Sequence, residues 1–155
     1  MEVSPDAYEV YSAVLTQHYG SWFKQKTPRL IFAQTVLEPQ GHSGGGCRAQ
    51  AEKNPIVLDL LDKLLSEKQE FRVEGKLRLP GPYKMVTGRL RTPENEEPGV
   101  FFLSMVEFSE DRSKAMVLVG RNCGALCGGG YVWILHKSNG SWRMAQDQLN
   151  CGWIS

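Results

Sequence analysis

The sequence has no long apolar run and almost no net charge, and each absence excludes a class of protein. No stretch approaches the roughly 20 consecutive apolar residues that a membrane-spanning helix needs. Lys and Arg number 18 against 17 Asp and Glu, a formal net charge of +1, so the broad positive charge typical of nucleic-acid-binding proteins is missing. A mild local excess at Lys24, Lys26 and Arg29 is interpreted as a solvated surface.

The N-terminal segment and the cysteines bear on the compartment. The segment MEVSPDAYEV is acidic and lacks the basic-then-apolar order of a signal peptide. We therefore expect either a cytoplasmic protein or the mature form of a periplasmic or secreted one. The four cysteines, Cys47, Cys123, Cys127 and Cys151, would suit two disulfides, which favours an oxidising compartment.

Two amphipathic helices are predicted in the first half of the chain. Ser4 and Pro5 are typical of a helix start, apolar residues recur at helical spacing from Ala7, and Gly20 offers a stop. Asn54 and Pro55 repeat the same start before a second helix that runs to about Gln69. Between them, residues 29–37 are predicted as a buried strand and residues 38–53 as a flexible polar loop.

The last third of the chain alternates between short apolar segments and turns. Four strands are expected within residues 99–146, and Asn139-Gly140 predicts a type I′ hairpin between the last two. Short links between successive strands favour an antiparallel meander. The predicted fold is a single α+β domain over residues 1–155, an antiparallel sheet of four to six strands with the two main helices packed on one face.

Cys123 and Cys127 lie in a glycine-rich stretch between two expected strands, which leaves three interpretations open. A disulfide between them would hold a tight connection and remove about 2 kcal/mol of unfolded-chain entropy. A redox centre more often has two intervening residues at a helix N-terminus. A zinc site usually has two close pairs of ligands, and only one such pair occurs here, so Cys47, Cys151, His42 or His136 would have to complete it. The structural disulfide is favoured, with no metal and no cofactor.

Cys47 and Cys151 have two possible roles. A bridge between them would close most of the chain and tie the HSGGGC segment to the C-terminus. Alternatively, Cys47 would be a free nucleophile beside His42 as its base.

The remaining candidates have structural interpretations beside the functional ones. The amide groups of Gly128, Gly129 and Gly130 could bind an anion, although the Lys-Ser/Thr ending of a nucleotide-binding loop is absent. His136 is a weak catalytic candidate, with packing on the face of its strand as the default. The other polar and aromatic candidates are interpreted as hairpin-tip or core residues: Glu107, Glu110, Asp111, His18, Trp133, Trp142 and Trp153.

The C-terminal third resembles an uncharacterised family of bacterial proteins. The shared pattern is Cys-Gly-x-Leu-Cys-Gly-x-Gly followed by an apolar strand, a hairpin and a terminal Trp-Ile-Ser. The matching positions are Phe108, Ala115, Cys123, Gly124, Leu126, Cys127, Gly128, Gly130, Trp142, Trp153, Ile154 and Ser155. Many members carry an export or lipoprotein signal, so the resemblance implies export; it implies no activity and no active site.

These observations leave two classes of function. The first is an exported, disulfide-stabilised accessory domain that binds a small molecule or a protein partner, without nucleic acid and without a membrane span. The alternative is a small enzyme with a pocket between sheet and helices, using His42, Cys47, His136 or an acidic residue as base or nucleophile. The sequence does not decide whether the protein is an enzyme.

Overall fold

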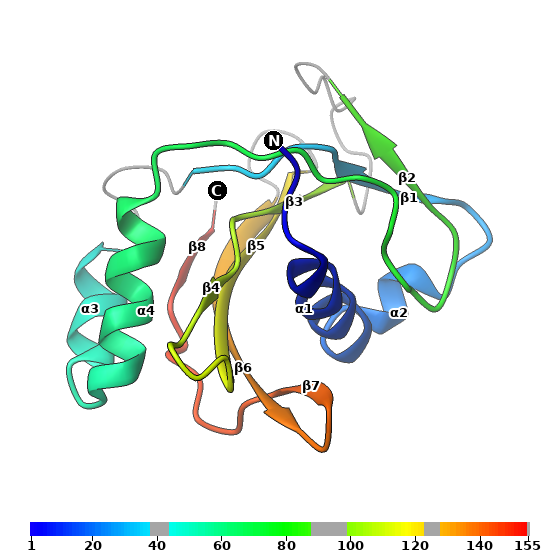
Figure 1. Cartoon of the computed structure of the whole chain (residues 1–155). Coiled ribbons are helices and arrows are strands. Elements are labelled where there is room, and N and C mark those ends of the chain that lie inside the picture. The colour runs from blue at the N-terminus through cyan, green and yellow to red at the C-terminus, as the bar shows by residue number, and fades with distance from the viewer. Residues whose placement is uncertain (38–43, 88–98, 123–127, 155) are drawn as a thin grey trace.

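A computed structural model describes residues 1–37, 44–87, 99–122 and 128–154 as an α+β structure with a mixed, curled sheet between two layers of helices (Figure 1). Helices α1 and α2 lie on one side of the central strands, and α3 and α4 lie on the other. The helices are α1 (Pro5–Gln17), α2 (Gly20–Phe23), α3 (Gly44–Ala51) and α4 (Pro55–Ser66). The strands are β1 (Arg29–Phe32), β2 (Tyr83–Val86), β3 (Val100–Leu103), β4 (Glu107–Phe108), β5 (Lys114–Asn122), β6 (Gly128–Ser138), β7 (Ser141–Met144) and β8 (Gly152–Ile154).

The two main helices begin where their capping residues predict. The hydroxyl of Ser4 accepts a hydrogen bond from the amide of Ala7, and Pro5 occupies the first turn of α1. The side chain of Asn54 accepts hydrogen bonds from the first amides of α4. Each helix therefore has backbone donors at its start satisfied by a local side chain, which is why these starts could be found in the sequence.

The sheet is mixed rather than antiparallel, which corrects the prediction from the sequence. Its main path runs β2-β1-β3-β5-β6-β7, with β4 paired to β5 and β8 paired to β6. Strand β1 lies parallel to both β2 and β3, and the pairs from β3 to β7 are antiparallel. The antiparallel part includes the predicted hairpin, where Asn139 and Gly140 have φ angles of 51° and 78°.

The helices cover both faces of the sheet rather than one, and the parallel pair explains why. Parallel neighbours cannot be joined by a hairpin, so the chain must leave the sheet between β1 and β2. It does so through α3 and α4, which pack on the face opposite α1. Two apolar clusters result, one under α1 and α2 and one under α3 and α4.

Helix α3 forms within the stretch that the sequence predicts to be a loop. Three glycines begin it, and glycine is a poor helix former. Its Cys47 and Ala51 side chains are fully buried in the cluster that α4 also lines. Tertiary packing, together with the bridge from Cys47, overrides the local preference.

The segment before β2 ties the N-terminus to the sheet. The Arg72 amide donates to the Met1 carbonyl at 2.8 Å, and the Val3 amide donates to the Arg72 carbonyl at 3.0 Å. On its other side the segment bonds to the residues after β1, with the Val73 amide donating to the Ala33 carbonyl at 2.9 Å. The first residues of the chain are thereby held beside α1, where they form part of the groove described below.

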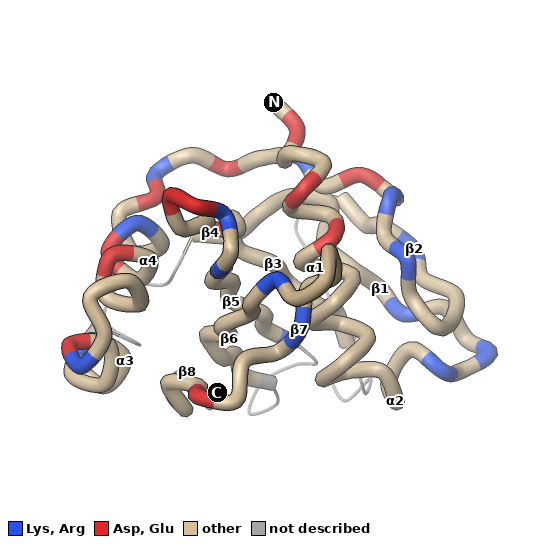
Figure 2. Tube along the Cα trace, turned by 60° about the horizontal axis from the view of Figure 1, so that its bottom comes forward, with Lys and Arg blue, Asp and Glu red and all other residues tan. Residues whose placement is uncertain are grey.

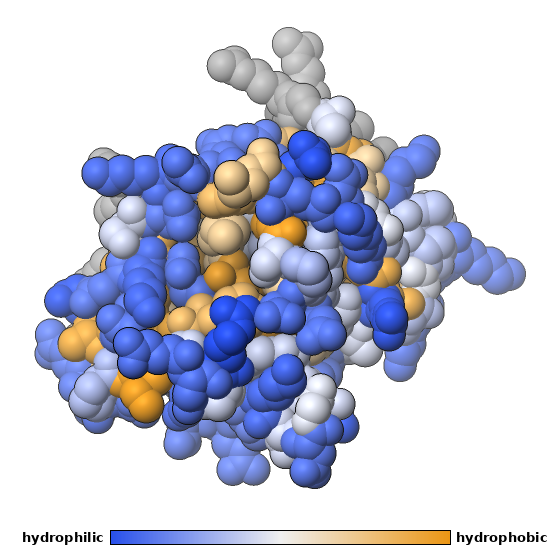
Figure 3. Space-filling model, viewed as in Figure 1, coloured by the Kyte–Doolittle hydropathy of each residue, from blue (hydrophilic) through white to orange (hydrophobic). Residues whose placement is uncertain are grey.

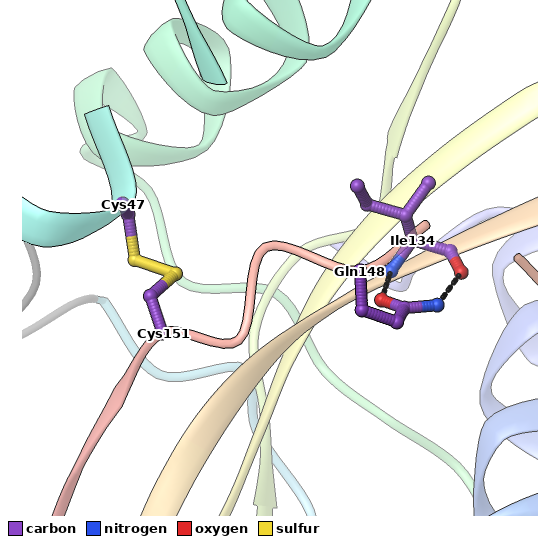
Figure 4. The surroundings of a disulfide bond; sticks show 4 residues. All are labelled: Cys47, Ile134, Gln148 and Cys151. Atoms are coloured by element: carbon purple, nitrogen blue, oxygen red, sulfur yellow. Dashed lines mark hydrogen bonds between the residues drawn. A yellow bond between two sulfur atoms is a disulfide. The ribbon is translucent and has the colours of Figure 1, made fainter. Parts of the chain in front are cut away.

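One edge of β6 is completed by a side chain. Strand β7 pairs with β6 from residue 135 onward and β8 pairs with it up to residue 131, which leaves a gap. Gln148 lies across this gap: its Oε1 accepts from the Ile134 amide at 2.9 Å and its Nε2 donates to the Ile134 carbonyl at 2.8 Å (Figure 4). The amide group of Gln148 therefore replaces one residue of a neighbouring strand.

Figure 3 shows that polar side chains cover most of the face seen in Figure 1, with an apolar strip between the two helix layers. No helix among the described residues is long and apolar enough to cross a membrane.

Candidate ligand-binding groove

Cys47 and Cys151 are bonded to each other in a buried disulfide. Their Cα atoms lie 5.3 Å apart, and the bridge joins α3 to the turn before β8 (Figure 4). This is the long-range pairing that the sequence analysis considered. With its sulfur in this bond, Cys47 has no thiol to act as the nucleophile of the alternative hypothesis. His42, its proposed base, and the pair Cys123 and Cys127 lie outside the described residues, so the short bridge stays a prediction.

The glycine run lies in a strand. Gly128, Gly129 and Gly130 are the first residues of β6 and pair with β5. Gly129 and Gly130 also pair with β8 on the other edge of the strand. Their backbone groups take part in strand pairing, and anion binding by these residues stays a prediction. On β8, glycine is required at position 152 by close packing, because a Cβ atom there would lie 1.9 Å from the Gly130 carbonyl oxygen.

The two described histidines lie apart from each other. His136 is half-buried in β6, between Lys114 and Arg143 on the adjacent strands. His18 ends α1, with its ring centroid 4.1 Å from that of Trp133, and burial lowers the pKa of its imidazole. Trp133 in turn donates a hydrogen bond to the Tyr19 hydroxyl at 3.1 Å. The aromatic side chains at this end of α1 therefore pack mainly on one another.

A groove of about 480 Å³ runs beside α1, between the N-terminal segment, the residues before β2 and the β6–β7 turn. Its size falls within the range of small-molecule sites, roughly 300–1,000 Å³. Segments far apart in the sequence build its walls, because α1 packs against β7 and the N-terminus is held by residue 72. The lining residues are Glu2, Pro5, Tyr8, Glu9, Ser12, Lys76, Arg78, Gly140, Ser141 and Trp142.

A hydrogen-bond network fixes one end of this groove. The buried Tyr8 hydroxyl donates to Glu2 Oε2 at 2.7 Å and accepts from the Glu74 amide at 2.7 Å. Lys76 Nζ also donates to Glu2 Oε2, at 2.8 Å. The hydrogen bonds from Lys76 and Tyr8 lower the pKa of Glu2, so its carboxylate stays ionised. Burial raises the pKa of Tyr8 to about 12, so the phenol keeps its proton and remains a donor.

The opposite charges in the middle of the groove are not paired with each other. Glu9 on α1 and Arg78 before β2 are both exposed, and neither has an ion-pair partner among the described residues. The Ser12 hydroxyl on α1 accepts a hydrogen bond from the Arg78 amide at 3.0 Å. This bond holds the backbone at Arg78 against α1. A carboxylate and a guanidinium thus stand in one groove with their charges available to a ligand.

Trp142 adds a polar group that the fold leaves unused. The side chain is 6% exposed, and its Nε1 is buried without an acceptor among the described residues. An unpaired buried donor of this kind costs about 1–3 kcal/mol.

The acidic residues of the β4–β5 region form a separate corner. Glu110 and Asp111 line a second hollow, of about 540 Å³, between the turn and the start of α4. Asp111 accepts hydrogen bonds from Ser113 and Ser109, which lower the pKa of its carboxyl and mark it as a turn residue. The half-buried Glu107 is different, because burial and then the Glu67 charge raise the pKa of its carboxyl. Among the described residues, no cluster of His, Cys, Asp and Glu could hold a metal ion.

Trp142 is the one groove residue that the sequence offered as a possible pocket-lining side chain, with core packing preferred; the other groove residues were not candidates. Glu9 and Arg78 are separated by most of the first half of the chain, and no local spacing signals their meeting. The one available signal was that α1 carries charged residues on the face opposite its apolar stripe.

Comparison with protein-family models, curated proteins and solved structures gives no match. The resemblance to an exported bacterial family therefore stays a prediction.

Proposed function

We propose that the chain is an exported, disulfide-stabilised binding domain whose groove beside α1 holds a small zwitterionic ligand. The observation that carries this proposal is that Glu9 and Arg78 are exposed in one groove and have no ion-pair partner among the described residues. A ligand carboxylate would accept two parallel hydrogen bonds from the Arg78 guanidinium, and a ligand ammonium would bind the Glu9 carboxylate. The neighbouring network of Glu2, Tyr8 and Lys76 supports the proposal because it holds the groove wall in place before binding.

A matched series of dipeptides tests the charge requirement. Glycylglycine carries both charges, N-acetylglycylglycine lacks the ammonium, and glycylglycinamide lacks the carboxylate. We expect glycylglycine to shift the backbone NMR resonances of residues around Glu9, Ser12 and Arg78, and each capped form to bind at least about tenfold more weakly.

Variants assign the effect to the groove. Glu9→Gln and Arg78→Gln should each remove the preference for glycylglycine over one capped form, and Arg143→Gln on β7, an exposed cation outside the groove, should leave it unchanged. Equal binding of all three peptides, or shifts confined to residues away from the groove, would contradict the proposal.

The proposal of export rests on the buried bridge between Cys47 and Cys151. Protein produced in an oxidising periplasm should be folded and resist thiol alkylation at these positions. Protein produced in a reducing cytosol should be alkylated there and lose much of its stability. Equal stability of the two preparations would remove this support.

A catalytic function is the second candidate, and the raised pKa of Glu107 is the observation that favours it. In that case the reaction would take place beside the C-terminal end of α4, where the charges of Glu67 and Lys63 act on the Glu107 carboxyl. Loss of a hydrolytic or isomerase activity on Glu107→Gln, with glycylglycine binding unchanged, would favour the enzyme.

A further inference from the structure

One third of the basic residues occur in two segments that contain no acid. Residues 10–37 include three cations and no Asp or Glu, and the same is true of residues 75–87. The cations of these segments are Lys24, Lys26, Arg29, Lys76, Arg78 and Lys84. In the sequence the two segments are far apart, so only the first trio stands out there.

The parallel pairing of β1 with β2 brings these segments together. Arg29 lies opposite Tyr83 in the register of the two strands, and its amide donates to the Pro82 carbonyl at 3.1 Å. The turns that precede the strands also touch, since a Cβ atom on Gly81 would lie 1.6 Å from the Phe23 carbonyl oxygen. The cations of both segments therefore share one end of the molecule.

Figure 2 shows where these cations lie. The α2–β1 connection and β2 carry Lys and Arg without Asp or Glu, whereas the α3–α4 region and the β4–β5 region carry charges of both signs. Lys24, Lys26, Arg78 and Lys84 are exposed and have no ion-pair partner among the described residues. We call these four residues and the half-buried Arg29 the basic face; Lys76 is left out because it pairs with Glu2.

We infer that the basic face binds the surface of a membrane containing anionic phospholipids. We expect a partner with an extended, negatively charged surface, because five cations lie on this one face although the net charge of the whole chain is only +1. The uneven placement of the cations would orient the molecule, since an anionic plane attracts the end that carries the basic face most strongly. The attachment is peripheral and reversible, because it rests on charge alone.

The distribution of the cations favours a lipid surface over nucleic acid. Lys24, Lys26 and Lys84 lie on an exposed turn and an edge strand, and none of the three lines either described hollow, so they offer a surface and not a channel for a strand. Arg29 is half-buried and donates from its Nε to the Trp22 carbonyl, so one edge of its guanidinium is already engaged within the protein.

Sedimentation with vesicles tests the inference. The wild-type chain should bind vesicles of phosphatidylglycerol and phosphatidylcholine in equal parts, and not vesicles of phosphatidylcholine alone. The bound fraction should disappear in about 1 M NaCl, where the Debye length falls to about 3 Å. The triple variant Lys24→Glu, Lys26→Glu, Lys84→Glu should lower the partition coefficient about 100-fold or more, since each surface cation contributes about fivefold.

A control variant with the same change in net charge tests whether the position of the cations matters or only the total charge of the protein. Lys53→Glu, Lys68→Glu, Arg143→Glu alters three exposed cations outside the basic face, and it should retain most of the binding. Circular dichroism and melting confirm that both variants are folded. Arg78 is unchanged in both variants, so glycylglycine binding in the groove can be measured independently. If glycylglycine does not bind, the test of vesicle binding still stands.

Three results would overturn the inference. The first is no binding of the wild-type chain to anionic vesicles at low salt. The second is equal loss of binding in the two triple variants, and the third is tighter binding to a DNA duplex than to anionic vesicles at the same ionic strength.

Discussion

Removing the bridge between Cys47 and Cys151 should cost the fold a large part of its stability. The bridge spans a sequence separation of 104 residues. On the loop-closure model, a loop of this size removes about 16 cal/mol/K of entropy from the unfolded chain, which is about 4.7 kcal/mol at 25 °C. Small globular proteins are stable by only about 5–15 kcal/mol, so the loss would leave a marginal fold.

The variant Cys47→Ala, Cys151→Ala is the appropriate perturbation, because both positions are buried and alanine introduces no hydroxyl there. Urea unfolding of the variant and the wild type, both without reductant, gives the difference in the free energy of unfolding. A loss of about 4–5 kcal/mol is expected, with a fall in Tm of about 10–20 °C for a chain of this length.

Reductant provides the control for this measurement. It should destabilise the wild type strongly, and in the double variant it should act only through the predicted Cys123–Cys127 bridge, by about 2 kcal/mol. A double variant within about 1 kcal/mol of the wild type would refute the reasoning, because the loop-closure contribution would then be absent.

Three further predictions concern single side chains. Gln148→Leu should lower the free energy of unfolding by about 1–3 kcal/mol in urea titrations, because the Ile134 amide loses its acceptor while the Ile134 carbonyl keeps the Ala145 amide as a donor; an unchanged midpoint would contradict this. Gly152→Ala should release β8, since its Cβ would collide with the Gly130 carbonyl, and amide hydrogen exchange of Gly129 to Tyr131 should become faster. Because the pKa of Glu107 is raised above its ordinary value of 4.5, its proton stabilises the fold at low pH, and stability should fall as the pH rises from about 4.5 through the raised pKa. Glu107→Gln should abolish that fall in pH-dependent melting curves, whereas Glu110→Gln at the exposed turn should not.

The elements that the sequence predicts well are those whose signals are local. Ser4 with Pro5 and Asn54 with Pro55 satisfy the first amides of their own helices, and Asn139-Gly140 sets its own turn. Each of these needs only a few neighbouring residues, so the pattern in the sequence suffices.

The elements that the sequence did not predict depend on distant contacts. Helix α3 begins with three glycines and forms because Cys47 and Ala51 are buried against the α4 layer. The parallel pairing of β1 with β2 has no local signature in a segment interrupted by prolines, and it decides which faces the helices cover. Local propensity therefore failed where tertiary packing decides the backbone.

The candidate site was harder to predict than the fold. Glu9 and Arg78 belong to no motif and meet only because α1 lies beside the segment that leads into β2. The bridge between Cys47 and Cys151 could be anticipated, because cysteines left over from a close pair tend to pair in oxidising compartments. Gly128, Gly129 and Gly130 begin β6, a position that their composition does not signal because glycine occurs in loops and in strands.

The topology of the sheet also sets an order of assembly. Strands β5, β6 and β7 follow one another along the chain as antiparallel neighbours, so the contacts between them close short loops. Strand β1 is paired on both sides with strands more than fifty residues later in the chain, so its closure costs more entropy. We expect the C-terminal hairpins to collapse first and β1 to dock late, as the slow step. On a ribosome this order has a cost: the N-terminal third emerges first and must wait, with the apolar face of α1 uncovered, until β7 has been synthesised.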